Sequence, residues 1–215
     1  YVNGSTTKIA PIVSSLRCCK LIVKHWIKKY NYVPDMIVIE GPEAGGHLGY
    51  QREELEEETK PKLENITKEI VDYINGIEKE TGKDIPVIAA GGIWDSADIK
   101  KYLNLGASGV QMATRFVATN ECDASMEFKE AYVNAKEEDI KIINSPVGMP
   151  GRAICNNFIK KVEKEKCKID KCYNCIKTCN IINSPYCITK ALINSVKGQT
   201  EDGLIFCGSN VSRIK

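Results

Sequence analysis

Short apolar runs alternate with longer segments of mixed polarity over the first 112 residues of the chain. The apolar runs lie at residues 8–13, 36–39, 85–89 and 109–112. Runs of this length, bounded by polar residues or by glycine and proline, are typical of strands buried inside a sheet. We therefore expect four buried strands in this part of the chain.

Between these runs, apolar side chains recur with helical spacing. Residues 16–30 and 66–77 repeat them every three or four positions and leave charged side chains for solvent. A third helix is expected after a cap at Asp95 or Ser96, and Gly106 is expected to end it. Strands that alternate with helices in this way predict an α/β fold with a parallel sheet covered by helices.

Beyond residue 120 the pattern is less regular. Two charged segments, residues 51–62 and 160–171, predict solvated connections or faces. The remaining predictions are a helix over 125–136, an extended piece over 140–143, a loop over 145–152, a helix over 186–197 and a short apolar stretch over 203–206.

Size and charge exclude several classes of protein. A chain of 215 residues can bury a sizeable core, in one domain or in one domain with an appendage. Its formal net charge of +2 argues against a nucleic-acid binder that depends on a broad basic surface. No apolar run is long enough to cross a membrane. The start at residues 1–4 has no initiator Met and no signal-peptide pattern, so we expect part of a longer protein.

The cysteines indicate the compartment. The chain has ten, and half of them lie between Cys167 and Cys187. A secreted disulfide scaffold would be shorter and would spread its cysteines more evenly. We therefore expect a reducing cytoplasm and one local cysteine site.

A glycine-rich loop is the first candidate for chemistry. Residues 40–49 read E-G-P-E-A-G-G-H-L-G and come directly after the expected strand at 36–39. Glycine lets the backbone approach a ligand closely, and a histidine such as His47 can handle a proton near neutral pH. A tight turn with a surface histidine is the alternative.

Two further strands end in small residues. Ala90-Gly91-Gly92 and Ala113-Thr114 come after consecutive expected strands and offer backbone N–H groups and a hydroxyl. Parallel α/β barrels bind phosphate at such strand ends, next to a short helix N-terminus. The same glycines would also serve as simple turns into helices.

The cysteine cluster is the second candidate site. Its spacing is Cys167-x4-Cys172-x2-Cys175-x3-Cys179, with Cys187 further along. The C-x4-C-x2-C start matches one iron–sulfur spacing, with Cys179 or Cys187 as a fourth ligand, and zinc would also accept four of these thiolates. Reduced thiols packed in a C-terminal cap, or redox-sensitive cysteines, are the alternatives. A metal here would be structural.

Four segments together resemble the nitronate monooxygenase (2-nitropropane dioxygenase) family of flavin enzymes. The same motifs occur in the related flavin-type enoyl-acyl-carrier-protein reductases. The similarity extends from Lys8 to Ala153. The segments are E-A-G-G-H-L-G at 43–49, I-P-V-I-A-A-G-G-I-W-D at 85–95, L-G-A-S-G-V-Q-M-A-T-R-F at 105–116 and S-P-V-G-M-P-G-R-A at 145–153.

The resemblance implies a TIM (β/α)8-barrel that binds FMN at the C-terminal ends of its strands. A barrel of this kind needs about 250 residues, so the chain would supply only the last four strands. We expect residues 1–155 to be the C-terminal half of the barrel and residues 156–215 a Cys-rich C-terminal extension. Half a barrel would expose two strand edges, which favours pairing with a partner or a second copy.

The resemblance also assigns roles to individual residues. His47 falls on the family's active-site histidine, and Glu40 falls on a flavin-contacting position that is often Gln. A carboxylate cannot donate a hydrogen bond as an amide does. The Q-M-G-T motif of the family becomes Q-M-A-T here, which is tolerable unless position 113 needs a positive φ. The cofactor-binding set implied is Glu40, Gly45, Gly46, Gly91, Gly92, Gln111, Met112, Ala113 and Thr114.

The implied activity is oxidation of an alkyl nitronate with FMN and O2 to a carbonyl compound and nitrite. FMN would carry the electron transfer, and the protein would supply orientation and a proton handler. The partners expected are the small-molecule nitronate and O2, without nucleic acid or membrane. Two alternatives stay open: an NAD(P)H-dependent FMN enoyl-acyl-carrier-protein reductase, and a non-catalytic metal- or partner-binding module on a decayed flavin fold.

Overall fold

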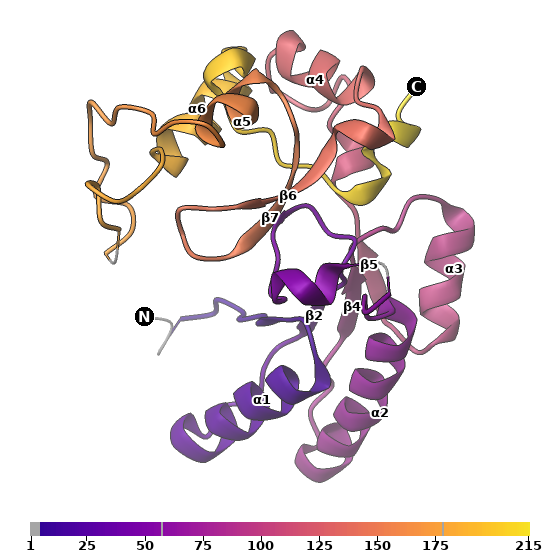
Figure 1. Cartoon of the computed structure of the whole chain (residues 1–215). Coiled ribbons are helices and arrows are strands. Elements are labelled where there is room, and N and C mark those ends of the chain that lie inside the picture. Colours follow the sequence, from indigo (N-terminus) through magenta and orange to yellow (C-terminus); the bar gives the residue numbers. More distant parts are fainter. Residues whose placement is uncertain (1–4, 57, 178) are drawn as a thin grey trace. The chain divides into compact units, whose positions relative to one another are not determined.

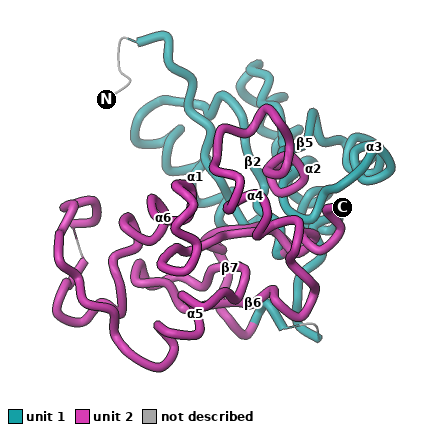
Figure 2. The backbone as a smooth tube through the Cα atoms, turned by 90° about the horizontal axis from the view of Figure 1, so that it is seen from above, with its two compact units in different colours: residues 1–42, 54–112 teal, residues 43–53, 113–215 magenta. Residues whose placement is uncertain are grey.

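The computed structural model describes residues 5–56, 58–177 and 179–215 (Figure 1). The start of the chain at residues 1–4, on which the expectation of a longer protein rests, lies outside the described residues. Two compact units are present: unit 1 comprises residues 1–42 and 54–112, and unit 2 comprises residues 43–53 and 113–215 (Figure 2). The expected division at residue 155 stays a prediction.

Unit 1 is built on a four-stranded parallel sheet. Its strands lie in sequence order, β1-β2-β4-β5, and every neighbouring pair is parallel. The predicted parallel sheet is therefore confirmed. The strands are β1 (Ile12–Val13), β2 (Ile37–Glu40), β4 (Val87–Ala90) and β5 (Gly109–Gln111).

Helices α1 (Leu16–Tyr30), α2 (Leu63–Thr81) and α3 (Ser96–Asn104) connect these strands. Parallel strands in sequence order need crossover connections, and these are right-handed in nearly all proteins, so the helices cover one face of the sheet (Figure 1). The Asp95 side chain caps α3 by accepting from the backbone N–H groups of Ala97 and Asp98, which confirms the predicted cap.

The core of unit 1 lies between these helices and the sheet. The face of α2 that was predicted from spacing is buried, including Ile70 and Ile74. Gly106 comes after α3 with a φ of +94°, a conformation that a residue with a Cβ rarely adopts, and it is the predicted helix-ending glycine. Among the described residues, β1 and β5 each pair with one strand, so the sheet is open rather than closed into a barrel.

Unit 2 contains a three-stranded antiparallel sheet in the order β3-β7-β6. Its strands are β3 (Gly46–His47), β6 (Ile140–Asn144) and β7 (Pro150–Ile154). The predicted loop over 145–152 is wrong in its second half, because β7 begins at Pro150. Proline is acceptable at the first position of a strand. Gly151 weakens a strand, but β7 still forms because it pairs with β6 along its whole length.

The rest of unit 2 is helical or irregular. Helices α4 (Met126–Val133) and α6 (Ile188–Val196) confirm two predicted helices with shorter bounds, whereas α5 (Asn157–Val162) was not predicted. Short 3₁₀ turns are η2 (Thr114–Phe116), η3 (Glu137–Asp139), η4 (Thr200–Asp202) and η5 (Ser209–Arg213), and a further turn, η1 (Arg52–Leu55), includes residues of both units.

Two stretches outside these elements contribute to the candidate sites. Between α5 and α6, the described part of residues 163–187 contains neither helix nor strand. Phe206 forms an isolated antiparallel bridge with Ala153, which ties the stretch before η5 to β7. Throughout the described part of the chain, no helix is both long enough and apolar enough to span a bilayer.

Candidate active site

His47 is held in place by β3 and its pairing with β7. Gly46 and His47 lie opposite Arg152 and Gly151 in the antiparallel register. Gly46 has a φ of +77°, which favours glycine and turns the chain into this short strand. The half-buried His47 side chain places its Nε2 atom 2.7 Å from the Oγ atom of Ser145.

Ser145 reaches His47 because it begins the turn between β6 and β7. The Gly148 N–H donates to the Ser145 carbonyl at 3.0 Å, with Pro146 at the second position of the turn and a φ of +82° at Gly148. The Val147 N–H donates to Ser145 Oγ at 3.4 Å. Only 8% of Ser145 is exposed, so its hydroxyl is fixed by the turn and aimed at the histidine.

Phe206 also contacts the imidazole. The two ring centroids are 4.9 Å apart, and the planes meet at 68° in an edge-to-face contact. A Cβ at Gly151 would lie 3.0 Å from the Phe206 ring, so the absence of a side chain at Gly151 makes room for this ring. His47 thus contacts both a hydroxyl group and an aromatic ring.

The glycine loop before His47 is anchored by backbone contacts. The buried Arg152 guanidinium donates a hydrogen bond to the Ala44 carbonyl, and the Ser209 N–H donates to the Glu43 carbonyl at 3.2 Å. At Gly45, a Cβ would lie 2.5 Å from the Cys207 carbonyl carbon and 2.6 Å from the Gly208 nitrogen. This close packing against the backbone of Cys207 and Gly208 is by itself a sufficient reason for glycine at position 45.

Thr114 and Ala113 lie at the start of η2. The Thr114 Oγ1 atom accepts a hydrogen bond from the Gly208 N–H at 2.9 Å, a bond that leaves the hydroxyl hydrogen able to donate elsewhere. Ala113 has a φ of −131°, so this position does not require glycine. The departure from the family motif is therefore compatible with the backbone.

The predicted residues of unit 1 meet at one edge of its sheet. Glu40, Ala90 and Gln111 are paired across β2, β4 and β5 at the carboxyl ends of these strands. The Ser14 hydroxyl donates to the Glu40 carboxylate at 3.0 Å. This is the edge at which parallel α/β sheets bind ligands.

Two consecutive glycines come after β4 at this edge. Gly91 and Gly92 have φ values of +101° and +75°, and a Cβ would strain both. The N–H groups of the first turn of α3 already donate to Asp95, so that helix end is occupied by a carboxylate. Met112, just after β5, is half-buried against the core of unit 1.

Sequence reasoning gave no role to three residues that shape the histidine site. Ser145, Arg152 and Phe206 contact the glycine loop or His47 itself. Ser145 and Arg152 stand inside the S-P-V-G-M-P-G-R-A motif, so a signal was present. Phe206 lay in an apolar stretch with no distinguishing pattern.

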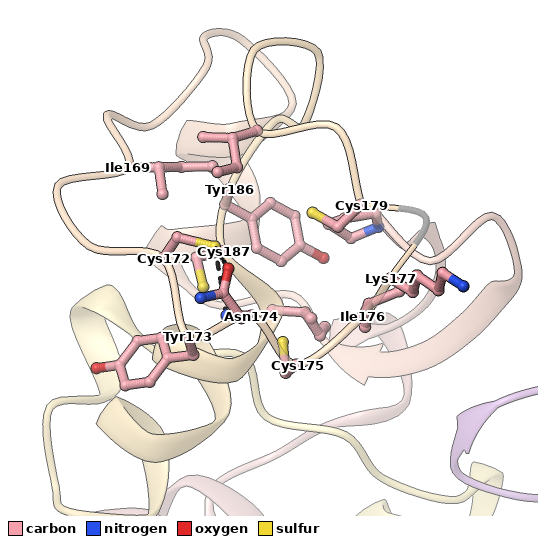
Figure 3. A pocket seen from close by; sticks show the side chains of 13 residues that line it. Ile169, Cys172, Tyr173, Asn174, Cys175, Ile176, Lys177, Cys179, Tyr186 and Cys187 are labelled. Atoms are coloured by element: carbon pink, nitrogen blue, oxygen red, sulfur yellow. Dashed lines mark hydrogen bonds between the residues drawn. The ribbon is translucent and has the colours of Figure 1, made fainter.

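Four of the five clustered cysteines line one pocket of about 190 Å³ in unit 2, namely Cys172, Cys175, Cys179 and Cys187 (Figure 3). Cys167 lines a neighbouring pocket instead. All ten cysteines are free thiols. Among the described residues, no three cysteine, histidine or acidic side chains are close enough together to hold a metal ion. The metal predicted at this cluster stays a proposal.

Solved structures of known proteins share the fold of this chain. FabK from Thermotoga maritima has a TM-score of 0.68 at 24% identity, covering 99% of this chain and 57% of that protein. Nitroalkane oxidase from Streptomyces ansochromogenes has a TM-score of 0.66 at 19% identity, covering 100% of this chain and 55% of that protein. The chain is thus an α/β protein whose fold matches a little more than half of each of these two structures.

The family model described as nitronate monooxygenase matches residues 3–215. The chain belongs to the nitronate monooxygenase family. A probable nitronate monooxygenase of Staphylococcus saprophyticus is 39% identical over 132 residues, and one of Staphylococcus aureus strain Newman is 35% identical over 130 residues. Each match covers 60% of this chain and 34% of the relative, so the chain spans about a third of the length of these curated relatives.

Proposed function

We propose that this chain is part of an FMN-dependent nitronate monooxygenase, which oxidises alkyl nitronates with O2 to a carbonyl compound and nitrite. Membership of the nitronate monooxygenase family supports this function. The observation that carries it is the contact of 2.7 Å between His47 Nε2 and Ser145 Oγ. A histidine oriented by a buried hydroxyl is suited to hold or move a proton on a substrate.

His47 can perform this task in either tautomer. A serine hydroxyl donates one hydrogen bond and accepts others, so Ser145 can pair with Nε2 whether or not that nitrogen carries the proton. Because the Val147 N–H also donates to Ser145, the hydroxyl keeps its position when the histidine changes its charge. His47 would accept a proton from a nitroalkane carbon, or donate a hydrogen bond to the nitro group of the bound nitronate.

The residues present fit FMN. In unit 1, the Gly91 backbone N–H is offered without a side chain beside it. In unit 2, taken by itself, the Thr114 hydroxyl can donate to a phosphate oxygen. Glu40 lies at the carboxyl edge of the unit 1 sheet and would approach the flavin as an acceptor. Bound FMN would supply the electron transfer between the nitronate and O2.

An enoyl reductase is the second candidate. The enoyl reductase domain of MlnA from Bacillus amyloliquefaciens shares the fold, with a TM-score of 0.60 at 12% identity, covering 97% of this chain and 61% of that chain. Such a likeness carries the fold alone, so chemistry has to separate the two functions. A reductase would consume a nicotinamide, which the monooxygenase does not.

The first test is a visible spectrum of the full-length protein under anaerobic conditions. We expect flavin absorbance that a nitronate bleaches and that NADH leaves unchanged. Rapid bleaching by NADH alone would replace the monooxygenase with the reductase. A protein that stays colourless after incubation with FMN would reject both enzymes and leave a non-catalytic module.

The second test replaces the histidine. His47→Asn should lower turnover of a neutral nitroalkane by about 10²- to 10⁴-fold, the usual contribution of a positioned acid–base group. A pre-formed nitronate has already lost its proton, so its turnover should fall less. His25→Asn is the matched control, because His25 is exposed on α1 and contacts Tyr30. Equal losses on both substrates would remove proton transfer from the role of His47.

A further inference from the structure

We propose that Cys172, Cys175, Cys179 and Cys187 bind one metal centre through their four sulfur atoms. The proposal concerns the segment between α5 and α6 and does not depend on the flavin chemistry. Four thiolates suit Zn²⁺ or an iron–sulfur cluster, and both share this ligand chemistry.

The folded chain selects four of the five clustered cysteines. Cys172, Cys175, Cys179 and Cys187 line the same pocket, although up to 15 positions separate them in the sequence (Figure 3). Cys167 lines the neighbouring pocket, and its N–H is bonded to the Pro185 carbonyl at 2.8 Å. The ligand set therefore reads C-x2-C-x3-C-x7-C rather than the C-x4-C-x2-C spacing that begins at Cys167.

Two of the four sulfurs already accept hydrogen bonds. The Asn174 N–H donates to Cys172 Sγ at 3.4 Å, and the Thr189 hydroxyl donates to Cys175 Sγ at 2.8 Å. Asn174 adopts a φ of +51°, a left-handed conformation that bends the chain between Cys172 and Cys175. Cys172 Sγ also donates to the Asn174 side-chain oxygen at 3.4 Å, and Cys179 Sγ lies 3.5 Å from the Ser184 hydroxyl. Polar contacts of this kind orient the ligands of a metal centre.

Tyr186 supplies an independent observation. Its side chain lines the cysteine pocket and is 3% exposed, yet among the described residues its hydroxyl has no hydrogen-bond partner. Buried polar groups are nearly always paired, so an unpaired hydroxyl at a pocket indicates a missing acceptor. A metal-bound thiolate is such an acceptor, and the Tyr186 O–H can donate to it.

The surrounding segment also lacks an ordering element. The described residues between α5 and α6 contain neither helix nor strand. Two of its apolar side chains stay in water, with Ile182 86% exposed and Ile181 44% exposed. A structureless stretch of this length is uncommon in a compact unit unless it has a function. Metal binding commonly supplies the missing folding free energy in small cysteine-rich segments.

Binding would require the segment to close. The four side chains are distributed around Tyr186 and do not meet at one point (Figure 3). Coordination of Zn²⁺ would release four thiol protons and leave a centre with two negative charges. Lys177 lines the pocket, so one nearby cation offsets part of this charge.

The test is metal analysis of the full-length protein, purified without oxygen and without chelators. We expect about one Zn²⁺ per chain, or iron together with acid-labile sulfide and broad visible absorption. Either result supports the centre and identifies it. Absence of both metals, with no uptake of added Zn²⁺ or of iron and sulfide by the reduced protein, would overturn the proposal.

Variants then test the ligand set. Cys175→Ser and Cys179→Ser should abolish stoichiometric binding, whereas Cys167→Ser and the distant Cys18→Ser should retain it. Thr189→Val and Tyr186→Phe should weaken affinity by about 10- to 100-fold, as is usual when a group that orients a ligand is lost. Metal retained by both pocket variants, or lost equally in Cys167→Ser, would refute this ligand set.

A second measurement protects the test against misfolded variants. Hydrogen exchange of the wild-type protein with and without metal should show added protection confined to residues 163–187. Circular dichroism should show that the variants keep the helices of both units. Protection that does not change when metal is removed would contradict the coupling between metal and this segment.

Discussion

Replacement of Ser145 by alanine tests the most specific contact of the candidate active site. The hydroxyl lies 2.7 Å from His47 Nε2 and also accepts from the Val147 N–H. The substitution keeps the Cβ atom of residue 145 and removes only its hydroxyl group. We expect the fold to persist and the histidine to lose its orientation.

The size of the effect is set by the hydrogen bond that is lost. A hydrogen bond contributes about 0.5–1.5 kcal/mol net, and an unpaired buried partner costs about 1–3 kcal/mol. Since about 1.4 kcal/mol is a factor of ten in rate, a loss of about 1–2 kcal/mol predicts a fall of roughly 5- to 30-fold in kcat/KM. The flavin content should not change.

The assay is nitrite release from a nitronate and from its parent nitroalkane by the full-length protein. Ser145→Thr keeps the hydroxyl and should recover part of the loss. Ser195→Ala is the matched control, because Ser195 is also buried and its hydroxyl donates to the Leu192 carbonyl on α6. A Ser145→Ala enzyme as active as the Ser195→Ala enzyme would refute a role for this contact.

Two further predictions concern stability. Gly45→Ala should lower the free energy of unfolding in urea by about 1–3 kcal/mol, because its Cβ would meet the backbone of Cys207. Gly76→Ala on α2 has open space for its Cβ and should raise the free energy of unfolding by about 0.5–1 kcal/mol. Equal effects of the two substitutions would show that close packing at Gly45 does not limit stability. The hydrogen bond from Tyr32, together with those from the Ile9 N–H and Lys83, holds the pKa of Asp35 well below its usual range. The folded carboxylate therefore contributes stability above about pH 4 that is lost as the pH falls further, so wild type should lose stability on acidification more steeply than Asp35→Asn, and parallel acid-unfolding curves would contradict this.

Local patterns were sufficient for unit 1. Helical spacing located α1 and α2, because each buries one apolar face on the sheet. The Asp95 cap and the Gly106 end were readable from single residues, since capping depends on local backbone geometry. Strand ends shifted by a residue or two at β2, β4 and β5, as at β2, where Glu40 extends the predicted strand. By contrast, β1 begins only at Ile12, whereas the predicted run began at Lys8.

The histidine site was only half predictable. The glycine loop pointed to His47, but its contact with Ser145 joins residues 98 positions apart. Such a pairing is set by the register of β3 on β7, and β7 itself was hidden by Pro150 and Gly151. Phe206 contacts the histidine ring from a residue whose strand pairing is a single isolated bridge to Ala153, and such a bridge has no periodic signal in the sequence. Sequence spacing similarly could not separate Cys167 from the four cysteines of the pocket.

The turn between β6 and β7 has a consequence for natural variation and for engineering. Side chains alternate between the two faces of a strand, so inserting or deleting one residue reverses every position beyond it. A length change at residues 145–149 would displace Ser145 from His47 or move the Arg152 side chain to the other face of β7. The exposed Met149 side chain, by contrast, can vary. This turn should accept substitutions at its tip and reject changes in length.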